Sequence, residues 1–166
     1  MDASDRRVAR FGPASVIGAA VLAGAAAFTP GFEGTVLHTY RDPAPRAIVT
    51  ACTGHTGPEL RMGMTFTPAE CKAMLDGDLQ KHWDGVSRCI HVAISVEEGV
   101  AYLDFGFNVG ADAFCGSGLL RKLNAGDRVG ACNGLLAWRY AGGKELPGLV
   151  RRRQQEQALC LKGATG

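Results

Sequence analysis

The chain has 166 residues, a formal net charge of +2 and 46% hydrophobic residues, a composition that fits one globular domain with a single core. A charge this small gives no reason to expect nucleic acid as a partner. The six cysteines lack the CxxC spacing of zinc sites and the histidines show no His-x-x-His motif, so no metal is predicted. The even number of cysteines instead favours disulfides in an oxidising compartment.

The first element in chain order is an uncharged stretch from Phe11 to Phe32, preceded by the basic segment Met1–Arg10. Its 22 residues are enough to cross a bilayer, which takes a helix of ~20 residues. The basic flank predicts that the N-terminus stays cytoplasmic while the rest is exported. The stretch is nevertheless only weakly apolar, because nine of the 16 residues from 14 to 29 are Ala or Gly.

Three interpretations of this stretch stay open. It could be a cleaved signal peptide, with Ala25–Ala27 as its small-residue site, or a permanent anchor. It could also be a segment that inserts, holds the protein at the membrane, and then leaves the bilayer to pack as a helix on the fold. We favour the third interpretation, since a segment rich in Ala and Gly tolerates either environment.

Two acids, Glu33 and Asp42, follow the uncharged stretch with eight residues between them. An acid at a helix end and one at a hairpin tip can face each other across a cleft, as glycosidic bond cleavage requires. One carboxyl group then donates a proton to the leaving oxygen, while the other stays charged and handles water. Alternatively, Glu33 only ends a helix and Asp42 only opens a turn before Pro43.

Strand patterns come next, followed by helix patterns. Strands are predicted at 36–40, 47–49 and 62–66, as a small antiparallel sheet. Helices are predicted at 68–87, 96–110, 118–124, 128–138 and 147–161, with a frayed tail at 162–166. Thr67 with Glu70, and Ser95 with Glu98, have capping-box spacing. The fold class is therefore α+β, a small sheet plus a mainly helical lobe that supplies the core.

Several segments together resemble one family. GFEG, YRD and TACTGHTG resemble the catalytic segment of the phage-type lysozymes, glycoside hydrolase family 24. MTFTPAECKAMLDGDL, FNVGADAF, LLRKLNAGD and WRYAGGKELPGLVRRR are similar to segments of signal-arrest-release endolysins of lambdoid phages. The resemblance implies a lysozyme-like fold and a muramidase that cleaves the β-1,4 bond between N-acetylmuramic acid and N-acetylglucosamine to lyse a host bacterium.

The same resemblance implies how the chain is organised and where it acts. Residues 1–32 would be the signal-arrest-release segment and residues 33–166 the lysozyme domain. The enzyme would be held at the periplasmic side of the host inner membrane and then released to the periplasm. A monomer without a cofactor is expected, with peptidoglycan as substrate and the inner membrane as a partner of the N-terminal segment.

By resemblance, Glu33 is the general acid and Asp42 positions or activates the attacking water. Such enzymes usually invert the anomeric centre, which needs carboxyl groups ~6.5 to 9.5 Å apart. The family's third position is a Thr that holds the water. Anchoring on the downstream run Cys52–Gly57 assigns it to Thr50, with an insertion of two or three residues within 42–47.

Four further residues are expected to bind substrate or to support the site. His55, between Gly54 and Thr56, should hydrogen-bond the backbone and brace the site. Asn108 is either a substrate-binding residue or a plain C-terminal cap of its helix. Arg152 and Arg153 match family positions, and an arginine near Glu33 could orient it through a charge-assisted bond.

The cysteine pairing also follows the resemblance, which covers four of the six. It implies Cys52 with Cys71 and Cys132 with Cys160, which leaves Cys89 with Cys115. A second function class stays open as well. The domain could be a degenerate, non-catalytic module that binds peptidoglycan or a partner, because the stretch from Asp42 to Thr50 is longer than the family pattern.

Overall fold

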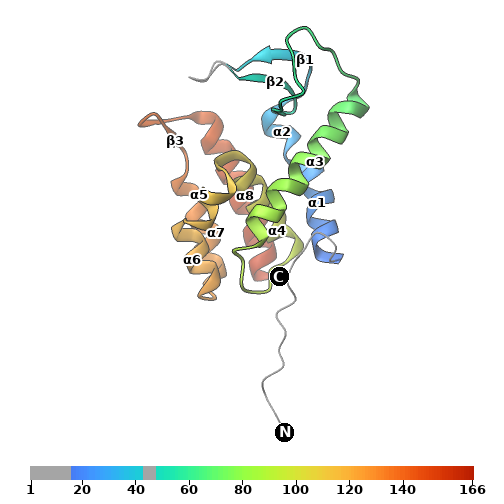
Figure 1. The fold of residues 1–166 in the computed structure, drawn as a ribbon. Coiled ribbons are helices and arrows are strands. Elements are labelled where there is room, and N and C mark those ends of the chain that lie inside the picture. Colours follow the sequence, from blue (N-terminus) through green and yellow to red (C-terminus); the bar gives the residue numbers. More distant parts are fainter. Residues whose placement is uncertain (1–15, 43–47) are drawn as a thin grey trace.

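The computed structural model describes residues 16–42 and 48–166. The helices are α1 (Val16–Phe28), α2 (Pro30–Glu33), α3 (Pro68–Ser87), α4 (Val96–Val109), α5 (Ala111–Cys115), α6 (Gly118–Asn124), α7 (Arg128–Gly134) and α8 (Pro147–Thr165). The strands are β1 (Val36–Arg41), β2 (Val49–Cys52), β3 (Tyr140–Ala141) and β4 (Lys144–Glu145), and a short 3-10 helix η1 spans Leu135–Ala137. Figure 1 shows the β1–β2 sheet at one end, with α3 running from it into the helical body.

The sheet near the site is a two-stranded antiparallel hairpin. β1 pairs with β2 so that Tyr40 faces Thr50, with an irregularity further along the pair. The prediction of a strand at 62–66 is wrong, because only one isolated bridge, His38 with Thr65, joins this segment to β1. The reason is local: Gly63 has a φ of 91° and its N–H donates to the Thr39 hydroxyl, so the chain turns there. The strand expected at 47–49 instead begins at Val49.

The helical body is built around α4. Both predicted capping boxes are present, at Thr67 for α3 and at Ser95 for α4. Residues 98 to 106 of α4 are buried on every side, because α1, α3 and α8 all pack against this helix (Figure 1). A helix with neighbours all round supplies most of the core, as the helical lobe was expected to do.

α1 packs on α4 through two reciprocal close contacts. A Cβ added to Gly24 of α1 would lie 2.6 Å from Val100 of α4, and one added to Gly99 would lie 2.4 Å from Val21. Val21 itself is 0% exposed. The small residues therefore let the two backbones approach closely. Among the described residues, no helix is both long enough and apolar enough to span a membrane.

The C-terminal third departs from expectation in four places, the first being the helix α5, which was not predicted. α7 ends at Gly134 and continues as η1 rather than running to 138. The β3–β4 hairpin was not predicted, and Gly142 and Gly143, both with positive φ, form its turn. The tail is not frayed, since α8 extends to Thr165 and the Gly163 carbonyl accepts a hydrogen bond from Arg128 at 3.1 Å.

Three disulfides join the expected partners. They are Cys52–Cys71, Cys89–Cys115 and Cys132–Cys160. The first fixes the end of β2 to the start of α3, and the third joins α7 to α8. The second joins the loop after α3 to the end of α5.

Candidate active site

Glu33 is the last residue of α2, a single turn that follows α1. Gly34 ends the turn with a φ of 69°, a left-handed conformation that suits glycine, and the chain then enters β1. The Glu33 side chain is 25% exposed. Its Oε1 accepts a hydrogen bond from Arg152, and its Oε2 lies 3.8 Å from where a Cβ on Gly54 would be. Glu33 thus lies between α8 and the turn after β2.

Arg152 connects Glu33 to a buried acid. Its Nε and Nη2 donate to the two carboxylate oxygens of Asp104 on α4, at 2.9 and 3.0 Å, while Nη1 reaches Glu33. The side chains of Arg152 and Asp104 are only 5% and 0% exposed. Burial lowers the pKa of Arg152, but the charges and hydrogen bonds of Asp104 and Glu33 outweigh it and raise the pKa. A charged, bidentate arginine thus has a fixed orientation toward Glu33.

Arg153 extends this polar cluster into the protein. One nitrogen, Nη2, donates to Glu156 at 2.6 Å and to Asn108 at 3.1 Å, and the guanidinium lies 4.9 Å from the centre of the Phe105 ring. Burial raises the pKa of Glu156 well above its ordinary range, although Arg153 opposes the shift. Arg153 therefore supports the contact between α4 and α8, and the exposed Asn108 is joined to the cluster through it.

Asp42 and Thr50 meet at one backbone carbonyl, that of Ile48. The Asp42 N–H donates to it at 3.0 Å, and the Thr50 hydroxyl donates to it at 3.2 Å. Because this contact uses the hydroxyl proton, the Thr50 oxygen can still accept a hydrogen bond, although the residue is only 2% exposed. Burial, then the charges of Asp42 and Glu33, raise the pKa of Tyr40.

His55 contacts carboxylates, whereas we expected its ring to bond the backbone. Nδ1 lies 2.7 Å from Asp78 of α3, and Nε2 lies 2.7 Å from Glu59. The backbone of His55 pairs with Ala51 on β2. Burial lowers the pKa of His55, but its hydrogen bonds to Glu59 and Asp78 outweigh burial and raise it. The histidine thus ties the turn after β2 to α3.

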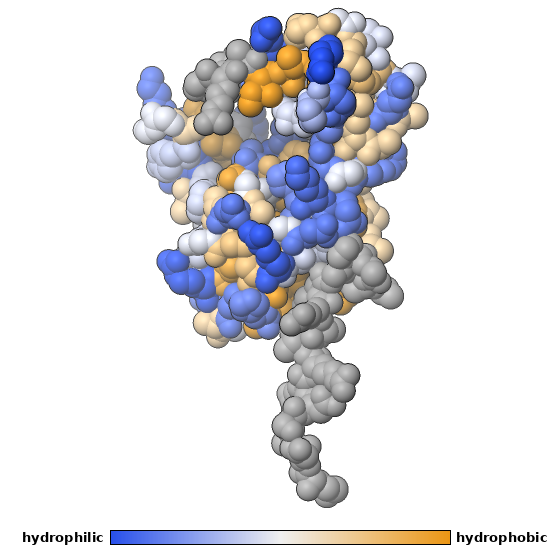
Figure 2. Space-filling view, in the orientation of Figure 1, coloured by the Kyte–Doolittle hydropathy of each residue, from blue (hydrophilic) through white to orange (hydrophobic). Residues whose placement is uncertain are grey.

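The structure places the expected residues in two groups, one of which contains Glu33 bonded to Arg152. Arg152 lies on the helical side, and Asp42 with Thr50 lies on the sheet side. In the space-filling view the molecule is hollowed between the sheet and the helical body (Figure 2). The insertion predicted within 42–47 falls mostly outside the described residues. Asp104 was missed, although a lone acid between Leu103 and Phe105 of an apolar helix was a signal for a buried partner.

Comparison with known proteins identifies the family to which the chain belongs. Residues 30–156 match the family described as "Phage lysozyme". The chain belongs to the phage lysozyme family. A "SAR-endolysin" of Bacteriophage PS119 is 44% identical over 133 residues, 80% of this chain and 78% of that protein. A "SAR-endolysin" of Enterobacteria phage P21 is 40% identical over 155 residues, 93% of each.

Solved structures agree with the family assignment. A mutant of P22 lysozyme has a TM-score of 0.74 at 34% identity, covering 82% of this chain and 94% of that one. The muramidase domain of SpmX from Asticaccaulis excentricus has a TM-score of 0.76 at 28% identity, with the same coverage. The lysozyme-like α+β fold is thereby confirmed. This phage lysozyme is an enzyme of the muramidase type, as the resemblance implied.

Proposed function

We propose that this phage lysozyme is an endolysin that hydrolyses the β-1,4 bond between N-acetylmuramic acid and N-acetylglucosamine, with Glu33 as general acid. The observation that supports this most is the fixed carboxyl group of Glu33. Arg152 holds one of its oxygens, and the other faces Gly54 on the sheet side. A general acid must lie within hydrogen-bond reach of the leaving oxygen, and a carboxyl group held at one oxygen can offer the other.

Asp42 and Thr50 would act on the attacking water. The carboxylate of Asp42 accepts a proton from the water as the water oxygen attacks the anomeric carbon, and the Thr50 oxygen orients that water by accepting its other hydrogen. Their shared contact with the Ile48 carbonyl holds both residues in one register of the hairpin. A water on the face opposite the leaving group inverts the anomeric centre, so we expect an inverting hydrolase.

We also propose that residues 1–32 form a signal-arrest-release segment, which holds the enzyme at the periplasmic side of the host inner membrane until release. Relatives that carry the name "SAR-endolysin" and match 93% of this chain support the proposal. So does α1, which lies packed on α4 and ends five residues before Glu33. Withdrawal of α1 into a bilayer would pull Glu33 away from Arg152 and keep the enzyme inactive.

Lysis by purified protein tests the catalytic proposal. Wild type should clear a suspension of peptidoglycan, and Glu33→Gln should be slower by ~10² to 10⁴ while its Tm stays within a few degrees of wild type. Glu97→Gln, at a glutamate paired with Lys162 at 3.7 Å, is the matched control and should keep full activity. Folded wild type that binds peptidoglycan without cleaving it would instead establish the non-catalytic module.

A further inference from the structure

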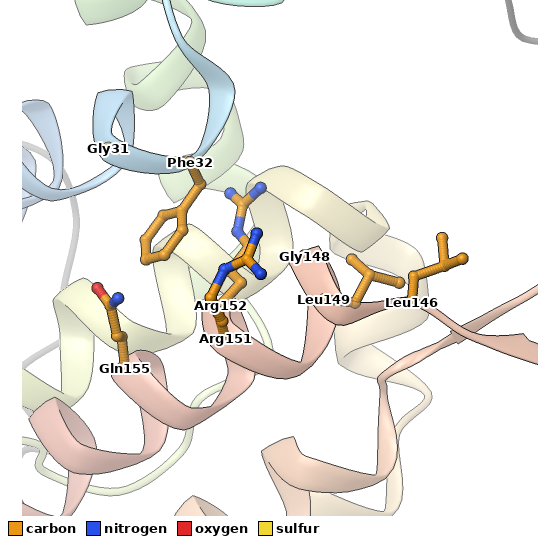
Figure 3. A pocket seen from close by; sticks show the side chains of 8 residues that line it. All are labelled: Gly31, Phe32, Leu146, Gly148, Leu149, Arg151, Arg152 and Gln155. Carbon is orange, nitrogen blue, oxygen red and sulfur yellow. The ribbon is translucent and has the colours of Figure 1, made fainter.

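A buried acid, Glu156, lies on α8 next to the arginine that binds Glu33. Arg152 extends from α8 toward α2, where its guanidinium lies 5.1 Å from the centre of the Phe32 ring (Figure 3). Glu156 follows Arg152 by one helical turn on the same face of α8. Its Oε1 lies 3.4 Å from Nε of Arg152 and 2.6 Å from Nη2 of Arg153. Glu156 therefore contacts the arginine that orients the proposed acid.

The two oxygens of Glu156 differ in their partners. The side chain is 0% exposed, so water does not reach either oxygen from outside. Oε1 accepts a hydrogen bond from Arg153, whereas Oε2 receives none from any residue that the structure describes. Asp104 on α4, also 0% exposed, lies within hydrogen-bond reach of the Glu156 carboxyl group. Two carboxylates have no donor between them, so a hydrogen bond between these two acids requires one proton.

The arginines decide which of the two acids holds that proton. Asp104 accepts from two nitrogens of Arg152, at 2.9 and 3.0 Å, which is the geometry of an ionised, bidentate pair. Glu156 has one short contact, to Arg153. Burial raises the pKa of Glu156 well above its ordinary range, and Asp104 raises it further, although Arg153 and Arg152 oppose the shift. Glu156 is therefore the acid that stays neutral.

The charges of the cluster lead to the same assignment. If Glu33, Asp104 and Glu156 were all ionised, they would face only two cations, Arg152 and Arg153. One negative charge would then be in excess, in a cluster where only Glu33 is as much as 25% exposed. A buried acid without a cation of its own takes up a proton instead.

The elements that pack closely on α8 are α4, α7 and η1, and within the described part of the chain they supply no further cation to Glu156. α4 has no lysine or arginine, and η1 has no charged residue. Arg128, the one charged residue of α7, pairs with Glu98. On α8 itself, Arg151 and Lys162 are exposed. The balance of charge around Glu156 therefore depends on its own proton.

We propose that Glu156 is a positioning residue for Glu33: it keeps its proton and donates it to Asp104, which leaves Arg152 bound to Glu33. The inference rests on the proposed function, in which Glu33 is the general acid. An ionised Glu156 would compete with Asp104 for Nε of Arg152, 3.4 Å away. Because the guanidinium is planar and rigid, a turn toward Glu156 would take Nη1 away from Glu33.

The pH dependence of stability tests whether Glu156 is protonated. An unfolded glutamate ionises at pH ~4.3, so the contribution of Glu156 to stability is complete below that pH and is lost as the pH rises through the raised folded-state pKa. Glu156→Gln copies the neutral acid and cannot ionise. Its Tm should match wild type in acid and equal or exceed it at neutral pH. A Tm loss that grows toward neutral pH would overturn the proposal, because Glu156 would then be an ionised partner of Arg153.

Glu98→Gln is the matched control for this series. Glu98 is also a glutamate that is 0% exposed, but it accepts hydrogen bonds on both oxygens, from Arg128 at 2.9 Å and from the Ser95 N–H at 2.7 Å. An amide cannot accept at both positions. Glu98→Gln should therefore lower Tm at neutral pH, where Glu156→Gln should not.

Kinetics test the effect of Glu156 on the site. Glu156→Leu fills similar space but has no proton to donate, and it should lower kcat about 10-fold or more with KM unchanged, as expected from losing a hydrogen bond to a charged group. Glu156→Gln should restore most of that kcat, since its amide N–H can donate to Asp104. Equal losses of kcat in the two variants would contradict the proposal, as would a wild-type kcat in folded Glu156→Leu.

Failure of the proposed function would give a different pattern. If wild type does not cleave peptidoglycan, the Tm series still decides whether Glu156 is protonated, and NMR of nitrogen-labelled arginine follows the bond to Glu33 without any activity. The Arg152 guanidinium signals should be the same in wild type and Glu156→Gln, and should change in Glu156→Leu as they do in Glu33→Gln. Unchanged signals in Glu156→Leu would show that Glu156 does not position Glu33. If Glu156→Leu does not fold, the Tm series and the arginine signals of Glu156→Gln decide the question.

Discussion

Arg152 donates a hydrogen bond to the carboxylate of Glu33 across 119 residues of sequence. The same guanidinium is held by Asp104, so the orientation of Glu33 depends on a buried pair on two other helices. Neither partner can move without moving the carboxyl group that we propose as the acid. The geometry of the site is thus set by the contact between α4 and α8 rather than by α2 alone.

Arg152→Lys should therefore impair both lysis and stability. A single ammonium group cannot bind Asp104 through two nitrogens and also reach Glu33. Leaving a buried carboxylate incompletely paired costs up to about 3 to 5 kcal/mol in the free energy of unfolding. Urea unfolding and turbidity clearing would measure the two effects. Arg121→Lys, at an exposed arginine of α6, is the control, and equal behaviour of the two variants would show that Arg152 does not hold Glu33.

Thr50→Val should reduce lysis far more than it reduces stability. Valine keeps the shape and loses the hydroxyl, so the bond to the Ile48 carbonyl disappears at a cost of about 1 kcal/mol. The proposed water would also lose the oxygen that accepts its hydrogen bond. Thr39→Val is the matched control, because Thr39 is also a buried hydroxyl of the sheet, bonded to Gly63 and Met64. Similar specific activities would place the water site elsewhere.

The contribution of His55 to stability should depend on pH. Its pKa is raised above 6.5 in the folded protein, so its ion pairs stabilise the fold fully below that pH. This stabilisation is lost as the pH rises through the folded-state pKa. His55→Asn should accordingly lower Tm most just below pH 6.5 and much less in alkaline buffer. His91→Asn, at an exposed histidine, is the comparison. A difference from wild type that stays constant with pH would contradict the ion-pair interpretation.

Two neighbouring substitutions in α1 should separate membrane retention from packing. Ala23 is exposed on the packed helix, so Ala23→Leu leaves the fold intact and adds about 2 kcal/mol of apolar transfer energy. Gly24→Leu adds more apolar surface than Ala23→Leu does but collides with Val100. We expect Ala23→Leu to delay release while the released protein keeps its activity and Tm. Gly24→Leu should also lose Tm and activity as a purified protein. Membrane fractionation and lysis timing would measure both.

The helices with complete local signals were predicted well from the sequence. Thr67 with Glu70, and Ser95 with Glu98, fix the starts of α3 and α4 by local hydrogen bonds, and both are where the pattern puts them. The strand at 62–66 failed because its apolar residues look like a strand while Gly63 turns the chain. The tail was predicted to be frayed because it lies at the end of the sequence, whereas a hydrogen bond from Arg128 to the Gly163 carbonyl holds it in place.

The site was only partly accessible to sequence reasoning. Glu33, Asp42 and Arg152 were named through a resemblance, since composition and spacing do not reveal that Arg152 reaches Glu33. The place of Asp104 in an apolar helix indicates that it has a buried partner, but that this partner is Arg152 depends on the packing of α4 against α8. The prediction that the His55 side chain bonds the backbone was wrong. Its partner Asp78 lies 23 residues away on a helix whose placement the sequence does not give.

The three disulfides have a consequence for the order of events after export. All of them join residues from 52 to 160, and residues 1–32 contain no cysteine. Oxidative bond formation takes seconds to hours, whereas docking of a preformed unit can take milliseconds to minutes. The slow covalent steps can therefore finish while α1 is still in the bilayer. In the release scheme proposed above, the tethered protein would already contain its three disulfides. The time of lysis would then depend on how fast α1 leaves the lipid.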